Sequence, residues 1–213
     1  MMKTRLIIFL VAVCFIPFVA CRTAGPLQPT QLSRINPAGP YVHSASGMTF
    51  PEHIGAFQRV EIIRYDSTGN DVSAGYNLAN QTHKVFMTVY IYPRPKMTSI
   101  SVFPPLVTKK SIPGIDSNHF EGIKTQIEKT YPGSKLVNED IVFLTQGGKR
   151  YQGQKATYES DSLPAFVNQE ALSDAYLFPY GNWFIAYRIS YLKVSHEAVN
   201  TDIEQFLQLL KWP

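Results

Sequence analysis

Residues 171–193 read ALSDAYLFPYGNWFIAYRISYLK, and this stretch carries the pattern that decides the fold. Pro179-Tyr-Gly-Asn182 has turn chemistry, so the segments 171–178 and 183–193 are predicted to form a β-hairpin. Successive side chains of a strand point to opposite faces. One face of the second segment is strongly apolar and carries Trp183, Ile185, Tyr187, Ile189 and Tyr191. The opposite face is mixed and carries Phe184, Ala186, Arg188, Ser190 and Leu192.

Five segments upstream of this hairpin also have strand patterns. The segments 57–65 and 72–78 are joined by a polar turn, and 72–78 alternates apolar and polar residues. The segment 85–92, VFMTVYIY, is β-branched and aromatic on both faces, which predicts a central strand. The segments 136–145 and 149–159 flank Gln-Gly-Gly, which indicates a second hairpin.

Two helices complete the predicted elements. The first begins near Asn118 and Glu121, which have capping-box spacing, and ends at Pro132-Gly133. The second begins after Ser195 and places apolar residues at helical spacing toward the C-terminus. Clustered strands with two helices predict an α+β fold: an antiparallel sheet of about six to seven strands packed with two main helices.

A resemblance to a known family accompanies this element order. The entry Phe50-Pro-Glu-His-Ile-Gly-Ala-Phe57 and the closing Phe206-Leu-Gln-Leu-Leu-Lys-Trp212 resemble the PsbP-type α/β sandwich. Bacterial DcrB-like envelope lipoproteins share that fold. The likeness covers residues 50–213 and implies a binding or assembly module. It transfers no functional residue, because no family-specific site motif is matched.

The first 21 residues have the pattern of a secretory signal. Lys3 and Arg5 precede an apolar run from Leu6 to Ala20, which is followed by Cys21. The run is shorter than the ~20 residues that a membrane-spanning helix needs. The cysteine after Phe-Val-Ala resembles a bacterial lipobox, which implies cleavage before Cys21 and a diacylglycerol on its thiol. A plainly secreted protein and a retained anchor are the alternatives.

The signal defines three predicted regions of the chain. Residues 1–20 form the signal peptide, residues 21–48 a flexible Pro/Gly-rich tether, and residues 49–213 a single globular domain. An N-terminal arm packed on the domain is the alternative for residues 22–47. Because no aspartate follows Cys21, the resemblance favours the outer membrane, facing the periplasm, for a Gram-negative source. Membrane attachment through the N-terminal lipid is therefore the first expected partnership.

Charge and cysteine content narrow the classes of function. Removal of Lys3 and Arg5 lowers the formal net charge from +4 to +2, which gives no reason to expect nucleic-acid binding. Cys14 and Cys21 are the two cysteines of the chain, and Cys14 lies inside the signal. A processed body therefore has no disulfide, no thiolate metal site and no cysteine nucleophile.

No catalytic or metal-binding motif stands out in the rest of the sequence. The five histidines are scattered without metal-ligand spacing, and neither a GxSxG nor an SxxK pattern occurs. Asp66-Ser-Thr-Gly-Asn-Asp71 only partly resembles a calcium loop and is better explained as a polar turn. We therefore expect no metal and no cofactor.

The aromatic residues near the last hairpin are the candidate binding residues. Trp183 and Tyr187 share one face of a strand, and Tyr176 and Tyr180 lie nearer the turn. Their rings could stack on a sugar or a peptide, although a stripe at strand spacing is also typical of a core.

The leading functional hypothesis is a lipid-anchored, non-enzymatic envelope module that binds a protein or cell-wall partner. One alternative is an envelope hydrolase with its site near the proline-rich loop 93–116, and another is a carrier of small ligands or lipids.

Overall fold

The computed structural model describes residues 32–78, 83–95, 115, 117–161 and 163–213. Its N-terminal half contains seven strands: β1 (Ser33–Ile35), β2 (Tyr41–Val42), β3 (Thr49–Phe50), β4 (His53–Ile54), β5 (Phe57–Arg64), β6 (Val72–Leu78) and β7 (Val85–Pro93). Its C-terminal half contains α1 (Ser117–Thr130), β8 (Lys135–Gln146), β9 (Lys149–Ser160), the short 3-10 helix η1 (Pro164–Phe166), β10 (Ala171–Tyr180), β11 (Trp183–Leu192), η2 (Lys193–Ser195) and α2 (His196–Leu209).

Among the described residues, nine strands form one antiparallel sheet. The order is β1-β5-β6-β7-β11-β10-β9-β8, and β4 pairs with β5 beside this path. Strands β2 and β3 form a separate two-stranded sheet. The α+β class is thus confirmed, as is the interior position of β7, whereas the predicted count of six to seven strands was too low. The missed strands are two or three residues long, too short to show an alternating pattern.

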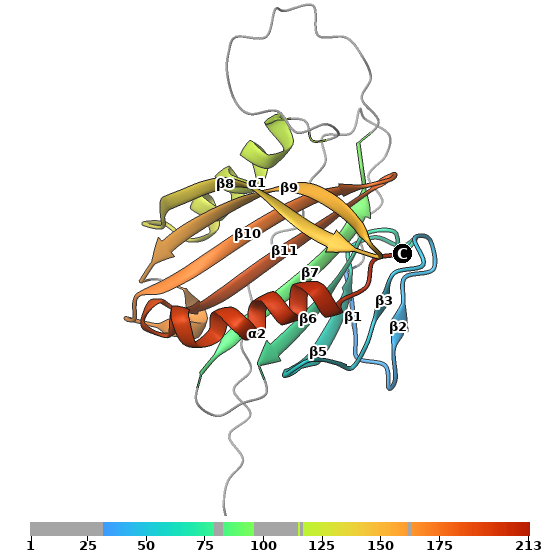
Figure 1. Ribbon diagram of the computed structural model, residues 1–213, viewed down its shortest axis with the longest axis horizontal. Helices are drawn as coiled ribbons and strands as arrows, with labels where there is room; N and C mark the ends of the chain where they lie inside the picture. Colours follow the sequence, from blue (N-terminus) through green and yellow to red (C-terminus); the bar gives the residue numbers. More distant parts are fainter. Residues whose placement is uncertain (1–31, 79–82, 96–114, 116, 162) are drawn as a thin grey trace, which may run out of the picture.

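Helices α1 and α2 cover opposite faces of this sheet. In Figure 1, α2 crosses in front of the sheet and α1 lies behind it near β8 and β9. Alternate residues of β11 belong to two different apolar clusters: Ile185 and Tyr187 pack with α2, and Phe184 and Ala186 pack with α1. The two hairpins β8–β9 and β10–β11 therefore carry apolar residues on both faces.

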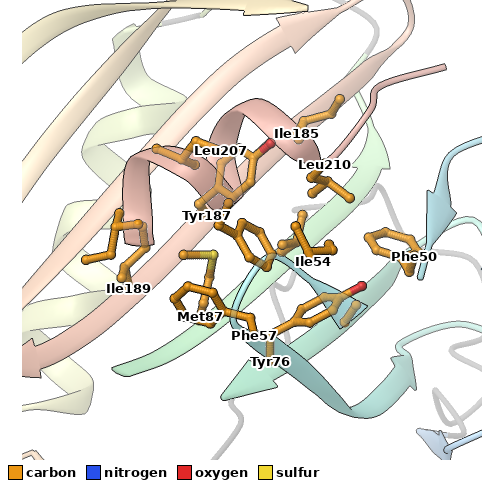
Figure 2. Close-up of a cluster of buried hydrophobic side chains, with 14 of the residues drawn as sticks. Phe50, Ile54, Phe57, Tyr76, Met87, Ile185, Tyr187, Ile189, Leu207 and Leu210 are labelled. Atoms are coloured by element: carbon orange, nitrogen blue, oxygen red, sulfur yellow. The ribbon is translucent and has the colours of Figure 1, made fainter. Parts of the chain in front are cut away.

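The larger core lies between the sheet and α2. Figure 2 shows Phe57, Tyr76 and Met87 directed from three strands toward the C-terminal segment. The ring of Phe206 in α2 meets those of Phe57 and Tyr76 edge to face, with centroids 5.0 and 5.1 Å apart. Such edge-to-face pairs are favourable aromatic contacts, so α2 is held by packing along its buried side.

The region predicted as a tether is folded over its second part. Strand β1 pairs with β5, so the N-terminal arm, residues 33–50, begins at the edge of the main sheet. The buried guanidinium of Arg59 donates hydrogen bonds to the carbonyl oxygens of Phe50, Pro37 (2.6 Å) and Gly39 (2.8 Å). The tether prediction for residues 33–48 was therefore wrong, because side-chain donors from β5 satisfy the carbonyl groups of this Pro/Gly-rich segment.

The signal segment, Cys21 and the first part of the predicted tether lie outside the described residues. Within the described part, neither helix combines the length and hydropathy needed to cross a membrane.

Candidate functional site

The predicted aromatic residues lie on the sheet face that packs against α2. Tyr187 is 1% exposed, and its hydroxyl accepts a hydrogen bond from Nε1 of Trp212 at 2.7 Å. Burial raises the pKa of Tyr187 well above its ordinary value. Tyr187 is therefore a core residue that is hydrogen-bonded to the C-terminal Trp212. Its side chain is too buried to contact a ligand.

The other three predicted residues remain partly exposed, and two of them lie beside this buried pair. The ring of Tyr180 lies 5.7 Å from that of Trp212, and the ring of Tyr176 lies 6.3 Å from that of Tyr187. Trp183 meets the buried His43 of the arm edge-on, with centroids 5.0 Å apart. The structure thus brings Tyr176 and Tyr180 together with Tyr187, while Trp183 holds the arm.

The proline-rich loop that was considered for a hydrolase site falls largely outside the described residues, which include only 93–95 and 115 of it. The described part is anchored, because Arg94 Nη1 donates to the carbonyl oxygen of Gly181 at 2.8 Å. The turn between β5 and β6 is polar as predicted, since Asp66 accepts hydrogen bonds from Thr68 Oγ1 and from the backbone N–H of Asn70.

A different residue, Arg188, stands out on the face that packs against α1. It lies in β11 and is only partly exposed. Its Nε donates to Ser173 Oγ at 2.7 Å, and its guanidinium carbon lies 5.6 Å from the ring centre of Tyr131. The hydroxyl of Ser173 is in turn 3.0 Å from that of Ser190.

The second terminal nitrogen of Arg188 is unpaired. Nη2 is buried and has no hydrogen-bond partner in the described part of the chain. No carboxylate of the described residues forms an ion pair with this guanidinium. Burial lowers the pKa of Arg188 from its ordinary value. An arginine nevertheless keeps its charge in proteins, so this nitrogen is a buried, charged donor without an acceptor.

Tyrosines surround the arginine on this face. Burial raises the pKa of Tyr90 to about 12, and burial likewise raises that of Tyr158, whose hydroxyl donates to Glu128 at 3.3 Å. These phenols therefore stay protonated at neutral pH and do not neutralise Arg188. We call Arg188, Ser173, Ser190, Tyr90 and Tyr131 the arginine cluster.

Arg188 falls on the mixed face of its predicted strand and was not among the predicted site residues. The available signal was a single arginine in a predicted strand that is otherwise mostly apolar. Its lack of a counter-charge could not be read from the chain, because the neighbours come from β7, β10 and the end of α1.

The described residues bring no metal-ligating group together: no set of three or more His, Cys, Asp or Glu side chains within that part of the chain could hold an ion. His119, for example, stacks on Phe184 with centroids 4.6 Å apart, and Tyr92 lies within hydrogen-bond distance of its Nε2.

No protein-family model and no curated protein matches the sequence. Among solved structures, the chain is similar to a Pseudomonas aeruginosa protein of unknown function, PA94, with a TM-score of 0.47 and 9% identity over 73% of this chain and 96% of that chain. It is also similar to CyanoP, the cyanobacterial PsbP of Synechocystis sp. PCC 6803. That match has a TM-score of 0.44 and 11% identity over 90% of this chain and 98% of that chain.

Proposed function

We propose that this chain is a lipid-anchored envelope protein whose folded body is a non-enzymatic binding module. The observation that carries the binding role is the arginine cluster, where a buried cation is held without a counter-charge. A protein that binds an anion there gains the missing interaction, and the hydroxyls and rings nearby are typical of binding sites with few polar groups.

Support for the anchor comes from the signal-like first 20 residues and Cys21. In a processed chain this thiol would be the sole cysteine, so it has no competing role in a disulfide or metal site.

Metabolic labelling with radioactive palmitate tests the anchor. We expect the wild type and Cys14→Ser to carry the label and Cys21→Ser to lose it. Cys14→Ser is the matched control, because it removes the other thiol from within the signal. Label retained by Cys21→Ser would contradict the anchor.

A thermal unfolding experiment tests the binding role without assuming a ligand. The protein is melted in detergent-solubilised envelope membranes and again after purification in the same detergent. A ligand that binds only the folded state raises the unfolding temperature, so purification should lower it. Equal unfolding temperatures would contradict the binding module.

A further inference from the structure

The register of the sheet places Arg188 in the middle of a row of small residues. Pairing across adjacent strands runs from Gly75 through Thr88 to Arg188, and then through Ala175 to Ala156. Arg188 is thus the one long, charged side chain at the centre of this row. Its partners on either side in the row, Thr88 and Ala175, are small, whereas Tyr131 lies against its guanidinium.

The carboxylates at the two ends of the same row form ion pairs with other basic residues and do not pair with Arg188. Glu61 pairs with Gly75 in the register and binds Arg34 at 2.9 Å. Glu139 lies opposite Ala156 at the other end and binds Lys124 at 2.7 Å.

The next acid, Asp174, precedes Ala175 in β10 and points to the opposite face. It accepts hydrogen bonds from Thr157 at 2.6 Å and Tyr191 at 3.2 Å, and it binds Lys155 at 3.2 Å. Because each of these acids has its own partners, none of them forms an ion pair with Arg188. An anionic ligand could supply the missing acceptor. Burying a charge without a partner is costly.

The chemistry of the neighbours narrows the class of anion. The cluster has one cation and two serine hydroxyls, and no second arginine or lysine of the described residues contacts it. One positive charge matches a monoanion, whereas a phosphate dianion would remain half neutralised. A guanidinium is a planar donor suited to a carboxylate.

Apolar surface next to Arg188 indicates what the carboxylate is attached to. Tyr90 and Tyr131 are both partly exposed and pack against the apolar cluster under α1, which includes Ile127 and Phe184. A ligand with an aromatic or aliphatic body would cover these rings while its carboxylate reached Arg188. The two serine hydroxyls would favour a polar ligand of any kind. The partly exposed tyrosine rings are what favour a ligand with an apolar group.

We propose that Arg188 binds the carboxylate of a small monocarboxylate ligand with an apolar body, on the sheet face between β7 and the end of α1. This assignment rests on the proposed binding function and specifies its ligand class. Ser173 orients the guanidinium through Nε, which leaves Nη2 for the ligand.

Ligand-dependent thermal unfolding of the full-length protein in non-ionic detergent tests the assignment. The probes are acetate, hexanoate and phenylacetate, with phenylacetamide as the neutral counterpart and inorganic phosphate as the competing anion. The proteins are the wild type, Arg188→Met and Arg150→Met. The last is a matched control, because Arg150 lies on β9 over the exposed ring of Phe143.

We expect phenylacetate or hexanoate to raise the unfolding temperature of the wild type and Arg150→Met more than acetate does. Arg188→Met should need at least tenfold more ligand for the same shift. The relative response to phenylacetate and hexanoate reports whether the body is aromatic or aliphatic. No response in the wild type, equal responses in Arg188→Met, or a larger effect of phenylacetamide or phosphate would overturn the assignment.

Arg188→Lys provides a second variant should Arg188→Met fail to fold. It keeps the charge but lacks both Nε and the planar fork, so the carboxylate response should be weakened. Full retention of the response in Arg188→Lys would also contradict the assignment. The two experiments can also disagree, if the protein unfolds at a higher temperature in solubilised membranes than after purification and yet responds to no carboxylate. That result would exclude carboxylates as the ligand class while still supporting a binding module.

Discussion

At the scale of single residues, Gly153 is a position where no side chain fits between two paired strands. A Cβ atom built on Gly153 in β9 would lie 2.4 Å from the ring of Phe178 and 2.6 Å from the carbonyl oxygen of Leu177. Real Cβ atoms essentially never make such contacts, and both neighbours belong to the paired strand β10. The requirement for glycine here comes from space rather than from an unusual backbone angle.

Gly153→Ala is therefore expected to lower the free energy of unfolding by about 3 kcal/mol, as overpacked cores do. Chemical denaturation of the purified variant measures the loss. Gly122→Ala in α1 is the control, since its Cβ would meet nothing within 4 Å, and alanine should stabilise that helix by about 0.5–1 kcal/mol. A neutral Gly153→Ala would mean that β9 and β10 separate easily at this point.

Asp71, in the turn before β6, gives a second prediction at this scale. Burial, with a smaller contribution from the charge of Asp66, raises the pKa of Asp71 to about 7. In the unfolded chain an aspartate titrates near ~3.9. Between these two values the unfolded chain loses the proton that the folded chain keeps, so this group's contribution to stability falls as pH rises from about 4 to about 7.

We therefore expect Asp71→Asn to be more stable than the wild type at pH 8, with the difference shrinking toward zero near pH 3.5. Thermal unfolding of both proteins across this range gives the difference at each pH. Asp202→Asn, in α2, serves as the control for an aspartate outside this turn. An advantage of Asp71→Asn that did not vary with pH would show that the carboxyl ionises normally in the fold.

At the scale of elements, one side chain of β5 binds the N-terminal arm at three points. Arg59 donates to three carbonyl groups of residues 33–50, and hydrogen bonds from a charged donor are stronger than neutral ones. The arm adds only β1 to the main sheet, and these hydrogen bonds act together with the burial of Met48 and Phe50 in the core.

Arg59→Met should release the arm without unfolding the sheet. Hydrogen exchange read by mass spectrometry is expected to accelerate at least tenfold in residues 33–50 and to stay unchanged in β10 and β11. Arg64→Met is the matched control, because Arg64 in the same strand contacts the ring and hydroxyl of Tyr41 from an exposed position. Faster hydrogen exchange spread evenly over the molecule would show that Arg59 stabilises the whole fold and not only the arm.

Helix and hairpin prediction succeeded where the pattern was local. The stripe of Phe120, Ile123 and Ile127 in α1 is buried as its spacing predicts. The hairpin turns around Gly147 and Gly181 likewise carry glycines with positive φ angles. These features depend on residues close in the sequence, which is why they could be predicted.

The arm and the arginine cluster depend on contacts between distant parts of the chain. Arg59 reaches a carbonyl 22 residues away, and Arg188 meets Tyr131 across the sheet face. A Pro/Gly-rich composition is typical of a tether, and it does not reveal that a buried donor elsewhere will satisfy its carbonyl groups. For the same reason the candidate aromatic residues were located on the correct strands, yet Trp212, which buries Tyr187, was not anticipated.

At the scale of the whole molecule, the docked arm would set the reach of the domain if the chain is anchored at Cys21 as proposed. Twelve residue steps separate Cys21 from Ser33, the first residue paired with the sheet. A fully extended chain spans ~3.3–3.6 Å per residue, so an acylated Cys21 would hold the sheet edge within about 40 Å of the membrane surface. Release of residues 33–48 would extend that limit to roughly 90 Å on the same scale. Arg59 would then help to set how far from the membrane an anchored domain could bind its ligand.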